Sequence, residues 1–212
     1  MFEPEILTAL WVSLRLTTIV TAVLAIIGPA VAVVITMLPG RLRRWTEPLL
    51  LLPLAMPPTV LGFYFLMVAP EGVPFTTAGV AAVCVVAAAP LAVGSMVTAI
   101  DGVDRQCLDA ATCLGLTPTR RFLRVTLPLC RRGFTGGLLL AAAHTMGAFG
   151  VVLMVGGSIA GQTRTLSIVI YDRVQTLDYA AAGRAAVWLL AGSVLLLVAV
   201  GWISPPPVAR RR

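Results

Sequence analysis

Few residues in this chain could do chemistry by themselves. Arg15 and Arg164 could each contact an anion, although an arginine near the end of a membrane span can also reach the interface with its long side chain. His144, the only histidine, lies within an uncharged segment, where we expect a buried imidazole bonded to a neighbouring carbonyl rather than a proton relay. Ser158 follows two glycines, as in some proteases, but His144 is about 21 Å away along a continuous helix. The sequence therefore predicts no catalytic residue.

Cofactor chemistry is limited by the types of residue present. The four cysteines, Cys84, Cys107, Cys113 and Cys130, have neither metal-ligand spacing nor a disulfide pattern, so we expect reduced thiols and no metal site. All sixteen basic residues are arginine. The nucleotide-binding loop G-x-x-x-x-G-K-[ST] needs a lysine to reach the phosphates. The chain is thus expected to have no cofactor and no enzymatic activity of its own, and ATP could drive it only through a partner.

The elements that would position these residues follow from composition. Of 212 residues, 58% are hydrophobic and 12% charged, against roughly 45–50% and about 25% in soluble domains. The mean hydropathy is +0.96. These values exclude a soluble globular chain, a disordered chain, a coiled coil and a disulfide-rich miniprotein. They predict an all-α polytopic membrane protein, in contact with lipid.

Five uncharged segments each exceed the roughly 20 residues that cross a hydrocarbon core. The predicted spans of this single domain, residues 1–212, are about 14–38, 48–69, 77–100, 134–155 and 185–203. A sixth candidate, 166–171, is too short to span and would be a re-entrant or surface piece. Gly28-Pro29 and Pro57-Pro58 are expected to break the first two spans near mid-bilayer. Such breaks either line a transport pathway or are kinks absorbed by packing, and the sequence leaves both open.

Orientation follows from the distribution of arginine. Five spans place twelve arginines on one side, in residues 41–44, 105–132 and 210–212, and four on the other. The arginine-rich side is predicted to be cytoplasmic, with the C-terminus inside and the N-terminus, which carries Glu3 and Glu5, outside. This orientation accounts for the net charge of +7, so no nucleic-acid partner is needed.

The cytoplasmic segment 101–132 is too long for a simple turn and predicts two short helices. Asp104 can cap the first helix and Gly115 can end it. Thr117-Pro118 can begin the second, and Leu127-Pro128 is expected to end it. From the residues alone, this amphipathic pair could dock into a groove of another protein or lie on anionic headgroups.

The same segment resembles the EAA loop of ABC importer permeases. Asp109-Ala110-Ala111, three residues, Gly115, nine residues and Val125-Thr126-Leu127-Pro128 fit the pattern E-A-A-x(3)-G-x(9)-I-x-L-P, with Asp109 for Glu and Val125 for Ile. In that family the loop docks into a cytoplasmic ATPase subunit. The resemblance implies that the residues coupling this chain to the ATPase are Asp109, Ala110, Ala111, Gly115, Leu116, Leu127 and Pro128.

Two further stretches look like those of molybdate permeases, so that the likeness extends over most of residues 10–203. Leu52 to Tyr64 is similar to their second-span signature, and Gly161 to Leu166 to the loop after their gate. Where those permeases typically read Gly-Glu-Phe-Gly, this chain has alanine in place of the glutamate. The resemblance implies a translocation pathway or gate at Pro57, Pro58, Thr59, Gly147, Ala148, Phe149, Gly150 and Arg164.

The function that this resemblance implies is that of a permease subunit of a type I ABC importer with five transmembrane helices, or six, in a prokaryotic cytoplasmic (inner) membrane. Its substrate would be a tetrahedral oxyanion, molybdate first and tungstate or sulfate next. Its partners would be a second copy of the chain, an ATPase dimer that binds ATP and Mg²⁺, and an external oxyanion-binding protein. A stand-alone secondary carrier is the alternative, although the predicted spans lack the carboxylates that such carriers use.

Overall fold

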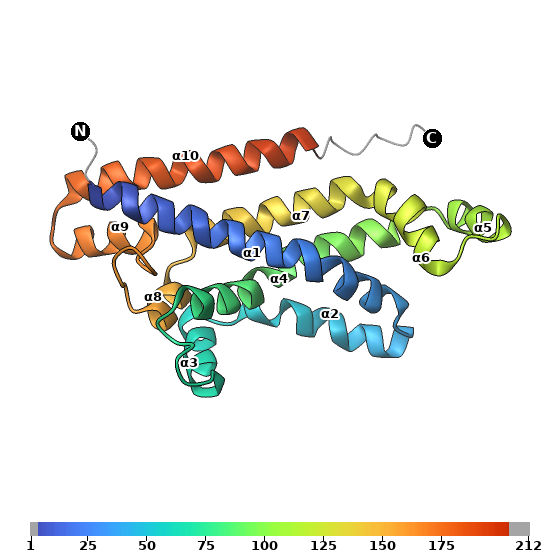
Figure 1. The fold of residues 1–212 in the computed structure, drawn as a ribbon, viewed down its shortest axis with the longest axis horizontal. Coiled ribbons are helices and arrows are strands. Elements are labelled where there is room, and N and C mark those ends of the chain that lie inside the picture. The colour runs from blue at the N-terminus through green and yellow to red at the C-terminus, as the bar shows by residue number, and fades with distance from the viewer. Residues whose placement is uncertain (1–3, 204–212) are drawn as a thin grey trace.

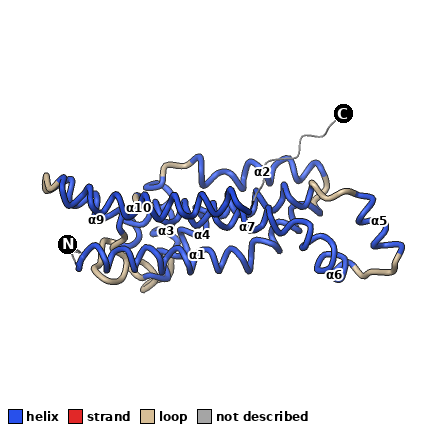
Figure 2. The backbone as a smooth tube through the Cα atoms, turned by 90° about the horizontal axis from the view of Figure 1, so that it is seen from above, coloured by secondary structure: helices blue, strands red, loops and turns tan. Residues whose placement is uncertain are grey.

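A computed structural model describes residues 4–203, and every regular element in that range is helical (Figures 1 and 2). The residues used for orientation at the two ends, Glu3 and 210–212, lie outside the described range. The helices are α1 (Pro4–Met37), α2 (Gly40–Ala55), α3 (Pro58–Val68), α4 (Thr77–Asp101), α5 (Arg105–Cys113), α6 (Pro118–Arg121), a π-helical turn (Phe122–Thr126), α7 (Leu127–Gly147), α8 (Gly150–Gly156), α9 (Leu166–Gln175) and α10 (Tyr179–Ile203).

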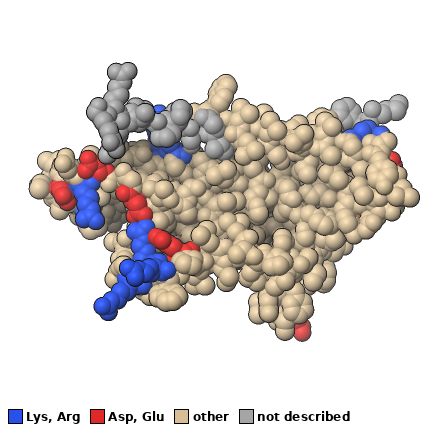
Figure 3. All heavy atoms as spheres, turned by 180° about the vertical axis from the view of Figure 1, so that it is seen from behind, with Lys and Arg blue, Asp and Glu red and all other residues tan. Residues whose placement is uncertain are grey.

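The long helices run along one axis, with α5 and α6 at one end and α9 at the other (Figure 1). Within residues 4–203, three helices are long and apolar enough to cross a membrane, and the number rises to five if each of two bent helix pairs is one span. Seen from behind, charged side chains gather at the end that carries α5 and α6, and the broad middle of this face is free of them (Figure 3). Each of the five predicted segments overlaps one of these helices or bent pairs.

The core is built around α4, which packs against both α1 and α7. Ala88, Ala92 and Met96 of α4 are fully buried. On α7, a Cβ at Gly133 would lie 2.4 Å from Ala99 Cβ, and one at Gly137 2.7 Å from Ser95 Cβ. Only glycine allows α7 to approach α4 this closely, and close approach is what stabilises helix pairs in lipid.

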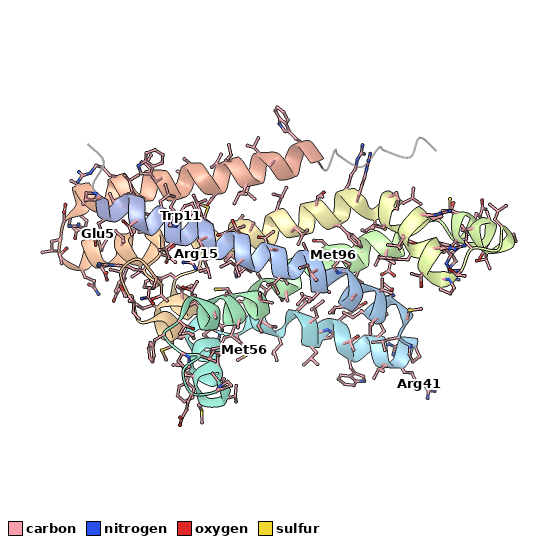
Figure 4. The ribbon with its side chains drawn as sticks, viewed as in Figure 1. Glu5, Trp11, Arg15, Arg41, Met56 and Met96 are labelled. Carbon is pink, nitrogen blue, oxygen red and sulfur yellow. The ribbon has the colours of Figure 1, made fainter. Side chains whose placement is uncertain are left out.

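The first span differs from its prediction because α1 is one continuous helix from Pro4 to Met37. The break expected at Gly28-Pro29 is wrong. Pro29 cannot donate a hydrogen bond to the carbonyl of Ala25, but the backbone at Gly28 packs so tightly on Met96 that an added Cβ would lie 3.0 Å from its sulfur atom. Packing on α4 therefore holds the helix together across the proline (Met96 is labelled in Figure 4).

The break expected at Pro57-Pro58 is confirmed, since α2 and α3 meet there at 103°. A second break separates α7 from α8 with a bend of 64°, within the segment 134–155 that the sequence predicts as one span. The short α9 has 10 residues, about 15 Å of helix, which is too short to cross the hydrocarbon.

The segment 101–132 forms one short helix, α5, as predicted, and the start of a second helix at Pro118. The Asp104 side chain accepts a 2.9 Å hydrogen bond from Gln106 N, and Gly115 follows α5 with φ +75°. The Thr117 hydroxyl accepts a 3.4 Å hydrogen bond from Arg120 N. The expected helix end at Leu127-Pro128 is wrong, because the helix widens into the π-helical turn, in which Leu127 N donates to the carbonyl of Phe122. This turn absorbs the missing N–H of Pro128, and the helix continues into α7.

Candidate functional site

The two helix breaks lie against each other. A Cβ built at Gly150, the first residue of α8, would lie 3.4 Å from Pro58 Cβ and 3.6 Å from Thr59 Cγ2, at the start of α3. One turn further along α3, a Cβ at Gly62 would lie 2.9 Å from Met154 Cβ of α8. Two of the sequence motifs, some 90 residues apart, are thus brought together by close packing of α3 on α8. We call the contact between Pro58-Thr59 and Gly150 the break junction.

The break junction is uncharged and lies open on one side. Pro57, Pro58, Thr59 and Gly147 are exposed, and Ala148, Phe149 and Gly150 are half-buried. Neither α3 nor α8 begins with a side-chain cap. The first backbone amides of α8 are therefore not occupied by a side-chain acceptor, whereas the first residue of α3, Pro58, has no N–H. Free amides at a helix start can attract an anion without a fixed charge that would hold it tightly. Met56 marks this junction in Figure 4.

An aromatic contact joins the break junction to α9. The rings of Phe149 and Tyr171 are 4.9 Å apart between centroids and inclined at 41°. Tyr171 was not identified from the sequence, because the short segment around it carries no motif. Because of this contact, a change in the backbone at Phe149 would displace Tyr171 and hence α9.

Arg164 lies outside the break junction, in an ion-pair network on the loop before α9. Its guanidinium contacts Glu5 Oε1 at 2.9 Å and Asp172 Oδ2 at 2.6 Å. Arg173 contacts the same glutamate at 2.5 Å and Asp178 at 3.6 Å. This outer network ties the start of α1 to the loop and to α9 (Glu5 is labelled in Figure 4). The charge of Arg164 is therefore balanced by two carboxylates, a pairing across some 160 residues that no local pattern could reveal.

The loop that carries Arg164 is held by buried hydrogen bonds. The Thr163 hydroxyl donates to the carbonyl of Gly156 at 2.6 Å and accepts from Ile159 N at 3.0 Å. Leu166 N donates to the hydroxyl of Ser13, on α1, at 2.9 Å. Because each of these polar groups is satisfied away from water, the loop has one defined shape.

The segment resembling the EAA loop protrudes at one end of the molecule (Figures 1 and 2). Asp109, Ala110 and Gly115 are exposed, whereas Ala111 is buried and anchors α5. Leu114, at the tip, is 82% exposed. Leu116 and Leu127 are half-buried, and Pro128 is exposed where α7 begins, outside α5 and α6. An exposed leucine on a protruding segment is suited to insertion into a groove.

The remaining candidates are isolated. Arg15 is exposed on α1 and makes no ion pair within residues 4–203 (Figure 4). The expectation of a buried, hydrogen-bonded His144 is wrong, because the side chain is exposed on α7 and forms no hydrogen bond with the described residues. A helix face that looks internal by sequence alone is here turned away from the neighbouring helices.

Comparison with known proteins gives one family and one fold. A family model described as "Binding-protein-dependent transport system inner membrane component" matches residues 25–205. Among curated relatives, the molybdenum transport system permease protein ModB of Azotobacter vinelandii is 36% identical over 203 residues, which cover 89% of this chain and 88% of the relative. The protein of the same name from Mycobacterium tuberculosis (strain ATCC 25618 / H37Rv) is 33% identical, over 95% and 81%. The sulfate transport system permease protein CysT of Salmonella typhimurium is 29% identical, over 93% and 76%.

Two solved structures share the fold. A chain of the MetNI methionine ABC transporter in inward-facing conformations superposes with a TM-score of 0.79 at 19% identity, covering 96% of this chain and 100% of that one. An amino acid ABC transporter crystallised with histidines superposes with a TM-score of 0.69 at 13% identity, covering 94% and 92%.

Proposed function

Because this chain belongs to the family of binding-protein-dependent transport system inner membrane components, we propose that it is the permease subunit of an ABC importer for a tetrahedral oxyanion, molybdate first. The two relatives named as molybdenum permeases support molybdate. The relative named as a sulfate permease supports sulfate as the second candidate. Tungstate, which has the shape and charge of molybdate, is expected to follow the same path.

The observation that carries this proposal is the contact of Gly150 with Pro58 and Thr59. Broken helices that meet within the membrane provide backbone amides along a path. No charged side chain belongs to the break junction, so an anion could pass it without being held. The junction is open on one side of a single chain, and five spans enclose too little to seal a path. A second copy of the chain is therefore proposed to close it.

Coupling to ATP hydrolysis is assigned to the protruding α5 and α6. We expect this tip to sit in a groove of a cytoplasmic ATPase subunit, with Asp109, Ala110 and Gly115 at the contact. The helix that begins at Pro118 is continuous through the π-helical turn to Gly147, a length of about 45 Å. Movement of the tip would thus be transmitted along one helix to the break at Ala148, without a flexible joint.

The proposed orientation places α5 and α6 in the cytoplasm and Glu5 outside, in an inner membrane. In this orientation the outer network lies on the face where a binding protein would deliver the anion. Arg164 is proposed to order the loop beside the pathway, since two carboxylates already balance its charge. ATP and Mg²⁺ would be bound by the partner ATPase.

Uptake competition tests the substrate. The chain is reconstituted in vesicles with its ATPase and binding protein, and ATP-dependent uptake of labelled molybdate is measured against unlabelled molybdate, tungstate or sulfate. We expect molybdate and tungstate to compete strongly and sulfate weakly. Stronger competition by sulfate than by unlabelled molybdate would assign the protein to sulfate. A lack of ATP-dependent uptake of all three anions, each supplied as the labelled substrate, would refute an oxyanion substrate.

A further inference from the structure

A cavity of about 810 Å³ lies between the cytoplasmic half of α1 and the segment that carries α5 and α6. One wall is apolar and is formed by α1, from Ile26 through Pro29 and Val33 to Met37. The opposite wall includes Phe122 together with the arginines Arg105 and Arg121. The cavity is thus apolar along the membrane span and cationic where the span leaves the membrane.

Among the described residues, the cations in this cavity have no acidic partner of their own. The one carboxylate on its wall, that of Asp101, forms a two-pronged ion pair with Arg43, one arm of which measures 3.1 Å. Arg121 donates a 3.0 Å hydrogen bond to the hydroxyl of Thr112, which leaves its charge uncompensated. Arg105 makes no ion pair with any described residue. Two positive charges therefore remain for a ligand.

The shape selects an amphiphile rather than a small ion. From Ile26 to Met37 the apolar wall is about 16 Å long, comparable with an acyl chain. A free phosphate would use the arginines but leave this wall uncovered, at a cost that grows with the apolar area exposed to water. The cytoplasmic leaflet supplies anionic phospholipids, and basic pockets between helices on that side are suited to their headgroups.

We propose that this cavity binds one anionic phospholipid of the cytoplasmic leaflet, with its phosphate on Arg105 and Arg121 and an acyl chain along α1. The bound lipid would bridge α1 and the segment that carries α5 and α6. These two elements move relative to each other if α5 is driven by an ATPase. The proposal rests on the orientation given under the proposed function, but not on the identity of the transported anion.

The test is lipid binding to the purified full-length chain, measured by native mass spectrometry in detergent with added phosphatidylglycerol, phosphatidylcholine or inorganic phosphate. The double variant Arg105→Gln/Arg121→Gln is compared with Arg120→Gln/Arg124→Gln, which removes two exposed arginines of the same segment that do not line the cavity. At about 1 kcal/mol for each arginine near a membrane surface, the first variant should bind phosphatidylglycerol roughly 30-fold more weakly. The matched control and phosphatidylcholine binding should be unchanged.

A second variant tests the apolar wall without altering charge. Ala30→Trp fills the cavity from α1 and should reduce phosphatidylglycerol binding as well, while far-UV circular dichroism reports whether the variants remain folded. Equal phosphatidylglycerol binding by the double variant and its control would overturn the proposal. So would binding of inorganic phosphate that is lost in the double variant without any preference for the anionic lipid, or displacement of the lipid when two copies associate. None of these readouts depends on uptake, so failure here is separable from failure of the proposed function.

Discussion

Gly115 lies between α5 and α6, at the protruding tip proposed to contact the ATPase, and its backbone conformation restricts which residues can replace it. Its φ of +75° is unfavourable for a side chain, yet an added Cβ would meet no atom within 4 Å. A substitution therefore costs about 1–2 kcal/mol in local strain without a clash inside the chain. The projecting side chain would instead meet whatever docks on the tip.

Gly115→Arg should accordingly abolish ATP-driven uptake while the chain still inserts in the membrane. Gly72→Arg is the matched control, because Gly72 has φ +82°, equally open surroundings and a position between α3 and α4, away from the tip. Uptake and membrane content are measured for both variants. Normal uptake by Gly115→Arg, or an equal loss in both, would show that the tip is not the coupling contact.

The outer network predicts that Arg164 acts through its carboxylate partners. Asp172→Asn breaks the 2.6 Å pair, and Arg164→Gln breaks this pair and the one with Glu5. Each ion pair lost should lower the free energy of unfolding by about 1 kcal/mol or less, since these pairs are partly exposed. Both variants should reduce uptake to a similar extent. A raised KM for the oxyanion in Arg164→Gln alone would instead indicate direct contact of Arg164 with the substrate.

At the scale of helices, the sequence correctly predicts the features that depend on neighbouring residues, such as helix caps. Asp104 and Thr117 cap α5 and α6 as expected, and the break at Pro57-Pro58 is real. Pro29 and Pro128 were expected to interrupt their helices but do not. In both cases the reason is a structural feature that the local sequence does not reveal. Met96 of another helix supports the first, and a widened turn absorbs the second.

The sequence predicts which residues belong to the candidate site, but it does not predict how they are arranged in space. The motifs around Pro58 and Gly150 were identified by resemblance, whereas their contact depends on how α3 and α8 fold back on each other. Glu5 and Tyr171 could not be identified at all, since their partners are distant in sequence or belong to no motif.

Packing of α3 on α8 leads to a prediction at this scale. A Cβ at Gly150 would already be in van der Waals contact with Pro58 and Thr59. The longer side chain of Gly150→Leu should therefore press on them and separate the two broken helices, so uptake should fall at least about tenfold. Gly94→Leu is the control, because a Cβ at Gly94 meets nothing within 4 Å. Transport by Gly150→Leu equal to that of the control would mean that the break junction does not line the path.

For the whole molecule, the arrangement of charge predicts orientation, and native cysteines can report it. Cys107 and Cys113 are exposed on α5, while Cys84 and Cys130 are buried. A membrane-impermeant maleimide should therefore label α5 in inside-out vesicles but not in intact cells, and Gly72→Cys should add labelling in intact cells. Labelling of Cys107 or Cys113 from outside would invert the topology.

The central claim is that the chain forms the path for the anion but does not hydrolyse ATP, and that a separate ATPase drives transport. The most direct measurement is molybdate uptake into vesicles that contain either the purified chain alone or the chain with its ATPase and binding protein, with and without ATP. We predict accumulation only in the complete system with ATP. Accumulation by the chain alone would contradict the account.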